Sequence, residues 1–212
     1  MTVLHARMFL RENIGLLQKM IPQMEKLIFV GDERYLNQQT NFDLQEVLAQ
    51  EFPDLQYEFL SAEAIPTDSL LNRLEAADRT KTGIIFSSWF KRSDYRNGAT
   101  IVSNAFRMIA HLPVPIYTMK SALMDDTGIL GGYLYDSELF MSNLRHTIET
   151  VLTGTQARTI PFYIPSEGKP TFSYPSLLQK GISPSQRPPG SVFLNQPPTY
   201  WDEHKTVLIW GG

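Results

Sequence analysis

The sequence predicts an α/β protein in which a parallel sheet lies between two layers of helices. Four strand-like segments alternate with three helix-like segments between residues 26 and 118. This alternation is typical of a parallel sheet that helices cover on both faces. The segment 83–86 reads Gly-Ile-Ile-Phe, without polar alternation, as expected for a strand buried on both faces. The composition, 42% hydrophobic and 19% charged, is that of a soluble globular protein.

At 212 residues the chain is long enough for one or two domains. We expect three parts: a lead-in helix over 1–25, an α/β lobe over 26–125, and a return helix and strand with a proline-rich tail over 126–212. The N-terminal segment is amphipathic, with Leu10, Ile14, Leu17 and Ile21 at helical spacing and Pro22 helping to end the helix.

The N-terminus lacks the apolar core and the cleavage site of a signal peptide. No run approaches the roughly 20 apolar residues of a membrane helix. The last segment, 206–212, turns apolar, as at the start of a membrane helix or as in a plain terminal strand.

The α/β lobe is expected to begin with a strand over 26–31 that ends at Asp32 and Glu33. A helix over about 40–52 follows, with Thr40 as a candidate N-cap, and then come a strand over 55–60 and a helix capped by Thr67. After the strand 83–86, Asn97-Gly98 leads into a third helix with a stripe made by Ile101, Ala105, Met108 and Leu112. The fourth strand, 113–118, contains two prolines, which place it early or at an edge.

The second part has a different pattern. The glycine-rich segment 128–133 lacks nucleotide-binding spacing and predicts a hinge or tight turn. Asp136 is expected to cap a long helix that Gly154 closes, with one apolar face made by Phe140, Leu144, Ile148, Val151 and Leu152. We then expect a strand over 159–164, a turn over 166–170, a short helix opened by Ser173 and ended by Gly181, and an extended surface tail over 184–198.

Polar and aromatic residues gather where the strand 83–86 leaves the sheet. Ser87, Ser88, Trp89, Phe90 and Tyr95 follow this strand. Ligands of open α/β sheets bind at the carboxyl ends of the strands. We therefore expect the acidic pair after the first strand, Asp32 and Glu33, to lie beside the segment 87–90. The alternative is an ordinary strand, a solvated loop and one buried tryptophan.

Several kinds of chemistry find no support in the sequence. There are no cysteines, and the four histidines lie in separate segments without ligand spacing. Neither a GxSxG nor an HExxH motif occurs, and a net charge of −3 without a basic patch argues against a nucleic-acid partner. We expect no catalytic residue, no metal and no cofactor.

Three stretches resemble known families. Residues 27–31, following 21–26, resemble the start of the second lobe in the ABC-type substrate-binding branch. Residues 128–164, GILGGYLYDSELFMSNLRHTIETVLTGTQARTIPFYI, look like the return crossing of type I periplasmic binding proteins in the ABC substrate-binding branch. Residues 173–210, SYPSLLQKGISPSQRPPGSVFLNQPPTYWDEHKTVLIW, are similar to the juxtamembrane end of the sensor region in bacterial hybrid two-component histidine kinases. In the resembled arrangement a first lobe precedes residue 1.

The resemblance implies a periplasmic-binding-protein-like lobe plus a return segment, with a ligand site at the carboxyl edge of the sheet. Candidate ligand-binding residues are Asp32, Glu33, Ser87, Ser88, Trp89, Phe90, Tyr95 and Tyr133. The rings would suit a sugar or an aromatic metabolite. Packing against helices is the competing interpretation for each ring, and it is favoured for Tyr133.

The resemblance further implies a small-molecule sensor region of a histidine kinase. It would lie on the periplasmic side of the bacterial inner membrane, act as a homodimer and continue into a membrane helix. The alternatives are a solute-binding protein of an ABC-type transporter and a dimerisation module without ligand. We also expect the apolar face of the helix after Asp136 to find a partner, either the N-terminal helix or a second copy.

Overall fold

The computed structural model describes residues 8–90, 108–109, 111–124, 128–161 and 167–198. The first half holds three parallel strands in the order β2-β1-β3: β1 (Lys26–Gly31), β2 (Gln56–Ser61) and β3 (Thr82–Phe86). Phe29 lies opposite Phe59 on one side and Ile85 on the other. The expectation of one parallel sheet is confirmed for these three strands.

The fourth expected strand, 113–118, is reduced to one bridging residue. Tyr117 forms parallel bridges to Ile85 of β3 and to Gly131 of β4 (Gly131–Tyr135). Pro113 and Pro115 have no N–H groups to donate to a neighbouring strand, which explains why the pairing does not extend. This residue joins the two halves of the sheet, because β4 continues into the order β4-β5-β6.

The second half departs from the sequence-based expectations. The segment 128–133, predicted as a hinge or turn, overlaps the strand β4. The predicted turn at 166–170 overlaps the strand β5 (Gly168–Ser173), which runs antiparallel to β4. Of the strand expected over 159–164, the described part is a 3-10 turn (Ala157–Thr159) and the two residues after it. The tail adds β6 (Val192–Leu194), parallel to β5, so it does not merely cover the surface.

Glycine allows β4 to approach its neighbours closely. A Cβ atom on Gly132 would lie 1.8 Å from the carbonyl oxygen of Thr118. The side-chain amide of Asn13 is fully buried and binds both backbone groups of Tyr133: its Nδ2 donates to the carbonyl oxygen at 2.9 Å, and its Oδ1 accepts from the N–H at 2.8 Å. Backbone hydrogen bonding therefore overrides the turn tendency of this glycine-rich segment.

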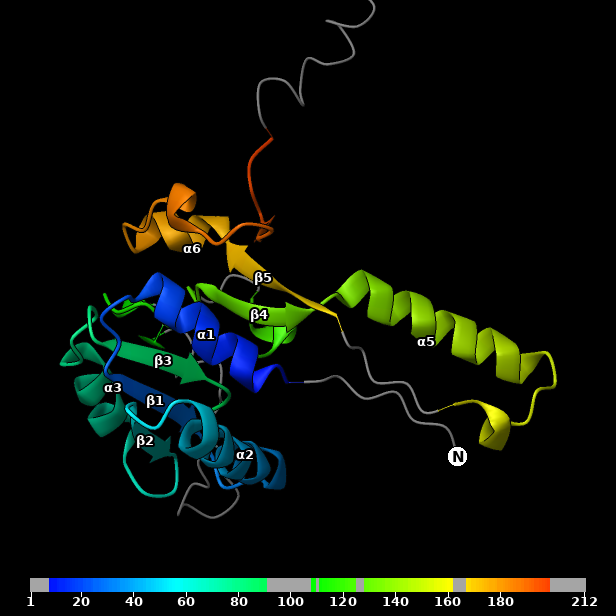
Figure 1. Cartoon of the computed structure of the whole chain (residues 1–212), viewed down its shortest axis with the longest axis horizontal. Coiled ribbons are helices and arrows are strands. Elements are labelled where there is room, and N and C mark those ends of the chain that lie inside the picture. Colours follow the sequence, from blue (N-terminus) through cyan, green and yellow to red (C-terminus); the bar gives the residue numbers. More distant parts are fainter. Residues whose placement is uncertain (1–7, 91–107, 110, 125–127, 162–166, 199–212) are drawn as a thin grey trace, which may run out of the picture.

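Helices cover both faces of the sheet, as the three-layer expectation requires (Figure 1). On one face, α1 (Leu10–Met20) and α2 (Tyr35–Glu51) bury Leu17 and Leu44 against Leu27 and Phe29. On the other, α3 (Thr67–Glu75) packs against the alternate residues of β1. This alternation follows from the two-residue period of a strand.

Two helix starts differ from the sequence-based prediction. Helix α2 begins at Tyr35, five residues before Thr40, whose hydroxyl donates back to the carbonyl oxygen of Leu36 inside the helix. Helix α3 has Pro66 as its N-cap residue. The hydroxyl of Thr67 accepts a hydrogen bond from the indole of Trp89 instead of capping the helix. Of the expected third helix, only residues 108–109 and 111–112 are described.

The return helix is confirmed. Helix α5 (Ser137–Leu152) starts at Asp136, whose carboxylate accepts from the backbone N–H groups of Glu138 and Leu139, and Gly154 follows it with a positive φ of 105°. Helix α6 (Tyr174–Gln179) is capped by Ser173 as expected. Helix α5 has no buried residue, and it projects away from the sheet (Figure 1).

Candidate functional site

The carboxyl ends of β1 and β3 bring together the acidic and serine residues that the sequence singled out. The hydroxyl of Ser88 donates to Oδ2 of Asp32 at 2.8 Å. The expectation that these side chains lie at the same end of the sheet is therefore confirmed. It follows from the parallel pairing of β1 with β3, which places residues after both strands at one edge.

Asp32 is the centre of a buried hydrogen-bond network. Its side chain is only 1% exposed. Arg34 donates to it through Nε at 2.9 Å and Nη2 at 2.8 Å, and the amide of Asn37 donates at 2.6 Å. Burial alone would raise the pKa of Asp32, but the hydrogen bonds from Arg34, Ser88 and Asn37 outweigh it and lower the pKa to about 2. The carboxylate stays ionised at neutral pH.

Asn37 links the network to the serine pair. Its Oδ1 accepts from the hydroxyl of Ser87 at 2.6 Å, and its Nδ2 also lies 2.7 Å from the hydroxyl of Ser88. Ser87, Ser88 and Asn37 are all buried. The expected hydrogen-bonding residues Asp32, Ser87 and Ser88 thus belong to one internal network, which Asn37 completes.

The surface of this edge is formed by a largely different set of residues from the buried network. A hollow of about 290 Å³ is lined by Asp32, Glu33, Arg34, Glu63 and Phe90. The guanidinium of Arg34, whose side chain is 58% exposed, lies 5.4 Å from the centre of the Phe90 ring, within the range of a cation–π contact. Glu33 accepts hydrogen bonds from Ser61 and Gln38, and these lower its pKa.

Lys120 adds a second cation to this edge. Its Nζ lies 3.4 Å from the carbonyl oxygen of Ser87. Burial lowers the pKa of Lys120, the charge of Arg34 lowers it further, and Asp32 acts in the opposite direction. Arg34, bound to Asp32, and Lys120, near the backbone of Ser87, give this edge two cationic donors that could hold a ligand.

The aromatic residues that were expected to contact a ligand lie in different environments. Trp89 is 1% exposed and belongs to the core beside α3, so it does not offer a face to a ligand. Tyr133 packs edge-on against Phe9, with ring centres 5.3 Å apart, in agreement with the packing interpretation favoured for it. Phe90 does line the hollow. Tyr95 lies outside the described residues.

Sequence reasoning missed Arg34, Asn37 and Lys120. A signal existed for Asn37, because it shares helical spacing with the buried residues Thr40, Leu44 and Leu48, and a polar residue on a buried face needs partners. Arg34 and Lys120 follow strand ends, as other polar residues do, and nothing in their spacing distinguished them. In the described part of the chain, no group of three histidine or acidic side chains is placed to hold a metal ion.

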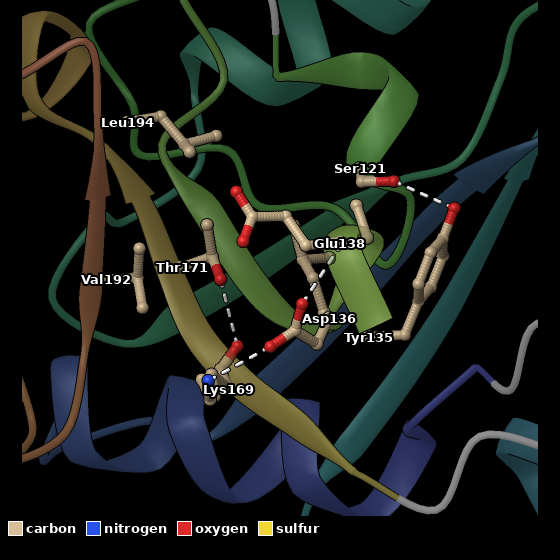
Figure 2. Close-up of a pocket in the computed structure, with 10 residues that line it drawn as sticks. Ser121, Tyr135, Asp136, Glu138, Lys169, Thr171, Val192 and Leu194 are labelled. Atoms are coloured by element: carbon tan, nitrogen blue, oxygen red, sulfur yellow. Dashed lines mark hydrogen bonds and ion pairs between the residues drawn. The ribbon is translucent and has the colours of Figure 1, made fainter. Parts of the chain in front are cut away.

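A second hollow lies where the return segment leaves the sheet (Figure 2). It measures about 320 Å³ and is lined by residues of β4, β5, β6 and the start of α5. The ammonium of Lys169 lies 3.0 Å from Asp136, and the hydroxyl of Ser121 lies 3.0 Å from that of Tyr135. In each pair the two polar groups interact with each other.

Comparison with known proteins identifies the fold. No protein-family model matches this chain, and neither does any curated protein. Among solved structures, the ligand-free, open form of a Clostridium difficile substrate binding protein with adhesive properties superposes with a TM-score of 0.66 at 9% identity. A conserved domain protein from Vibrio cholerae gives 0.62 at 12% identity, and an ABC domain from Streptococcus pneumoniae in complex with L-Trp gives 0.57 at 17% identity.

These structures cover most of this chain, at 92%, 91% and 86% respectively, whereas the chain spans only 63%, 62% and 59% of their lengths. The chain has the fold of substrate-binding proteins, which confirms the expected periplasmic-binding-protein-like fold class. Among the residues that the structure describes, none of the helices has both the length and the apolar character that a membrane crossing requires.

Proposed function

We propose that this chain is the membrane-proximal lobe of an extracytoplasmic small-molecule sensor, in a two-component histidine kinase of the bacterial inner membrane. The observation that carries the proposal is the carboxyl edge of β1 and β3, where a buried hydrogen-bond network holds Arg34 beside Phe90 at an open hollow. Preorganised polar groups beside an aromatic ring are typical of small-molecule sites.

The resemblance of residues 173–210 to a kinase juxtamembrane segment supports the sensor role. In such a sensor the ligand shifts the equilibrium between open and closed lobes, and only a difference in its affinity for the two states supplies the free energy. The proposed parts remain 1–25, 26–125 and 126–212, with a first lobe before residue 1 and a membrane helix after the tail. A solute-binding protein of an ABC-type transporter is the second candidate, favoured by the fold of the L-Trp-bound structure.

The test of ligand binding is a thermal-shift screen with sugars and amino acids, beginning with L-tryptophan, on this chain and on a longer chain that includes the preceding lobe. A ligand that binds only the folded state raises the melting temperature. Phe90→Ala and Lys120→Met should each weaken binding of any compound found by about 10-fold. Arg145→Met on α5 is the matched control. Binding that both site variants leave unchanged would exclude this edge as the site.

Helix α5 supports the homodimer as part of the proposal. It carries five apolar side chains that are more than a third exposed: Leu139, Met141, Ile148, Val151 and Leu152. Burying one large apolar side chain contributes about 1.5 to 3 kcal/mol, so covering this face favours association. Sedimentation at tens of micromolar should show a dimer that Leu144→Glu and Ile148→Glu dissociate. A monomeric wild-type chain would contradict the homodimer and also the alternative of a dimerisation module.

A further inference from the structure

Three connections of the chain meet at one end of the second half of the sheet, β4-β5-β6 (Figure 1). Helix α1 begins there, β4 ends there and leads into α5, and β5 begins there, because β4 and β5 are antiparallel and Tyr135 lies opposite Gly168. Helix α5 projects from this end, although none of its residues is buried. Its direction therefore depends on how the connections are held.

Asn13 fastens α1 to β4 at this end. Its fully buried amide makes three hydrogen bonds: Nδ2 donates to the carbonyl oxygens of Phe9 at 2.8 Å and Tyr133 at 2.9 Å, and Oδ1 accepts from the N–H of Tyr133 at 2.8 Å. A Cβ atom on Gly132 would lie 2.9 Å from this Oδ1, so glycine lets the amide reach the strand. Because water does not reach these groups, opening the contact would leave buried donors and acceptors unsatisfied.

Two rings and a second glycine bring β5 into the same contact. The ring of Phe9, the residue before α1, packs edge-on against Tyr133 with ring centres 5.3 Å apart. A Cβ atom on Gly168, at the start of β5, would lie 2.8 Å from the Phe9 ring and 2.7 Å from the Tyr133 ring. Glycine leaves room for both rings at this position. Phe9, Asn13, Tyr133 and Gly168 thus form one joint that holds all three connections.

The joint lies between α5 and the tail. Only Leu134 and Tyr135 separate Tyr133 from Asp136, the cap residue of α5. Helix α5 is about 24 Å long, so a force on its far end acts strongly on its start. On the other side of the joint, β5 pairs with the tail strand β6 through Thr171, Phe172 and Ser173. A closely packed contact transmits displacement because it has no free volume to absorb it.

From this arrangement we infer that Phe9, Asn13, Tyr133 and Gly168 form a coupling joint, which passes a displacement of α5 to α1 and, through β5, to the tail strand β6. Its role in signalling rests on the proposed sensor function, in which the tail leads to the membrane. The coupling itself is a property of this chain and is tested without a ligand.

The first measurement is the direction of α5 in the 212-residue chain, which has no cysteine, so that two introduced cysteines are its only labelling sites. Gln50→Cys at the end of α2 and Arg145→Cys on α5, both at exposed positions, carry spin labels, and dilution with unlabelled chains suppresses distances between copies. Pulsed EPR should give one narrow distance distribution, which Asn13→Leu should replace by a broad one. The control Asn41→Leu, which removes the hydrogen bond from the Tyr57 hydroxyl, should keep the distribution narrow.

The second measurement is hydrogen exchange along the sheet. Asn13→Leu should speed exchange of the Tyr133 amide by about 10-fold or more. Exchange in β5 and β6 should rise with it, because the joint holds the start of β5, while β1 and β3 keep their wild-type rates. An equal rise in all strands would indicate a general loss of stability and would contradict a specific coupling.

Gly168→Ala provides a second variant, which decides the question where Asn13→Leu does not fold. It leaves Asn13 in place but forces the rings of Phe9 and Tyr133 apart, so it should broaden the distribution and speed exchange in β5 and β6. A narrow distribution with unchanged exchange in the folded variants would overturn the inference, as would an equal change in Asn41→Leu. Since no ligand is used, such a result leaves the ligand screen unaffected, and a failed screen does not contradict the joint.

Discussion

The two ends of the parallel sheet differ in how their polar side chains find hydrogen-bond partners. At the carboxyl end, Asp32 accepts six hydrogen bonds, which come from Arg34, Asn37, Ser88 and Phe90. At the amino end, the hydroxyl of Tyr117 has no partner among the described residues. The edge where α/β proteins usually bind ligands therefore has a carboxylate whose hydrogen bonds are completed within the protein, whereas the tyrosine hydroxyl at the opposite edge borders a hollow open to water.

The largest effect is expected from Asp32→Asn, which removes the charge at the centre of the completed network. Arg34 would lose its ionised acceptor, and the new amide would place N–H groups against existing donors. We expect a loss of about 2 to 4 kcal/mol in the free energy of unfolding, measured by urea denaturation. Asp54→Asn, at an exposed position, should change this free energy by less than about 0.5 kcal/mol. Similar losses in the two variants would show that the network is not special.

Acid should remove the same stabilisation in the wild-type protein. The pKa of Asp32 falls from its ordinary value of 3.8 to about 2 on folding, so its contribution is complete above pH 3.8 and disappears as the pH falls through about 2. The shift corresponds to about 2 kcal/mol. Unfolding curves from pH 6 to pH 2 should show the stability gap between wild type and Asp32→Asn narrowing only below about pH 4. A gap that stays constant to pH 2 would contradict the lowered pKa.

A smaller loss is expected from Ser88→Ala. This change removes one donor to Asp32 and one acceptor for Asn37, but Arg34 still compensates the carboxylate. The expected loss is about 1 to 2 kcal/mol in the free energy of unfolding, by the same denaturation assay. An unchanged stability would mean that water replaces the serine hydroxyl at no cost.

The smallest effect is expected from Tyr117→Phe at the amino end. The hydroxyl removed has no described partner, so stability should stay within about 0.5 kcal/mol of the wild type or rise slightly. Comparison with Ser88→Ala in one series tests whether the two ends really differ. A loss above about 1 kcal/mol would reveal a partner for the hydroxyl and would contradict the difference between the two ends.

The chain pattern alone determined the central part of the fold. The segments 26–31, 55–60 and 83–86 were recognisable as strands. The apolar runs of the first and third suit strands buried on both faces, whereas Gln56 and Glu58 interrupt the second, which forms the edge strand β2. The contact between Asp32 and Ser88 then followed from the rule that parallel strands end at one edge. The long helix after Asp136 was also predictable, since its cap, apolar stripe and closing glycine are local signals.

Tertiary structure decided the rest, because the deciding contacts lie far apart in sequence. Local signals gave a turn at 128–133, yet Asn13 and the backbone of Thr118 hold this segment as a strand. The sequence predicted that Trp89 would contact a ligand, but in the folded protein it packs in the core and its indole binds Thr67 of α3. The tail joined the sheet only because β5 offered an unpaired edge. Likewise, the cations Lys19, Arg79 and Lys180 are scattered in sequence, and only folding brings them to one hollow.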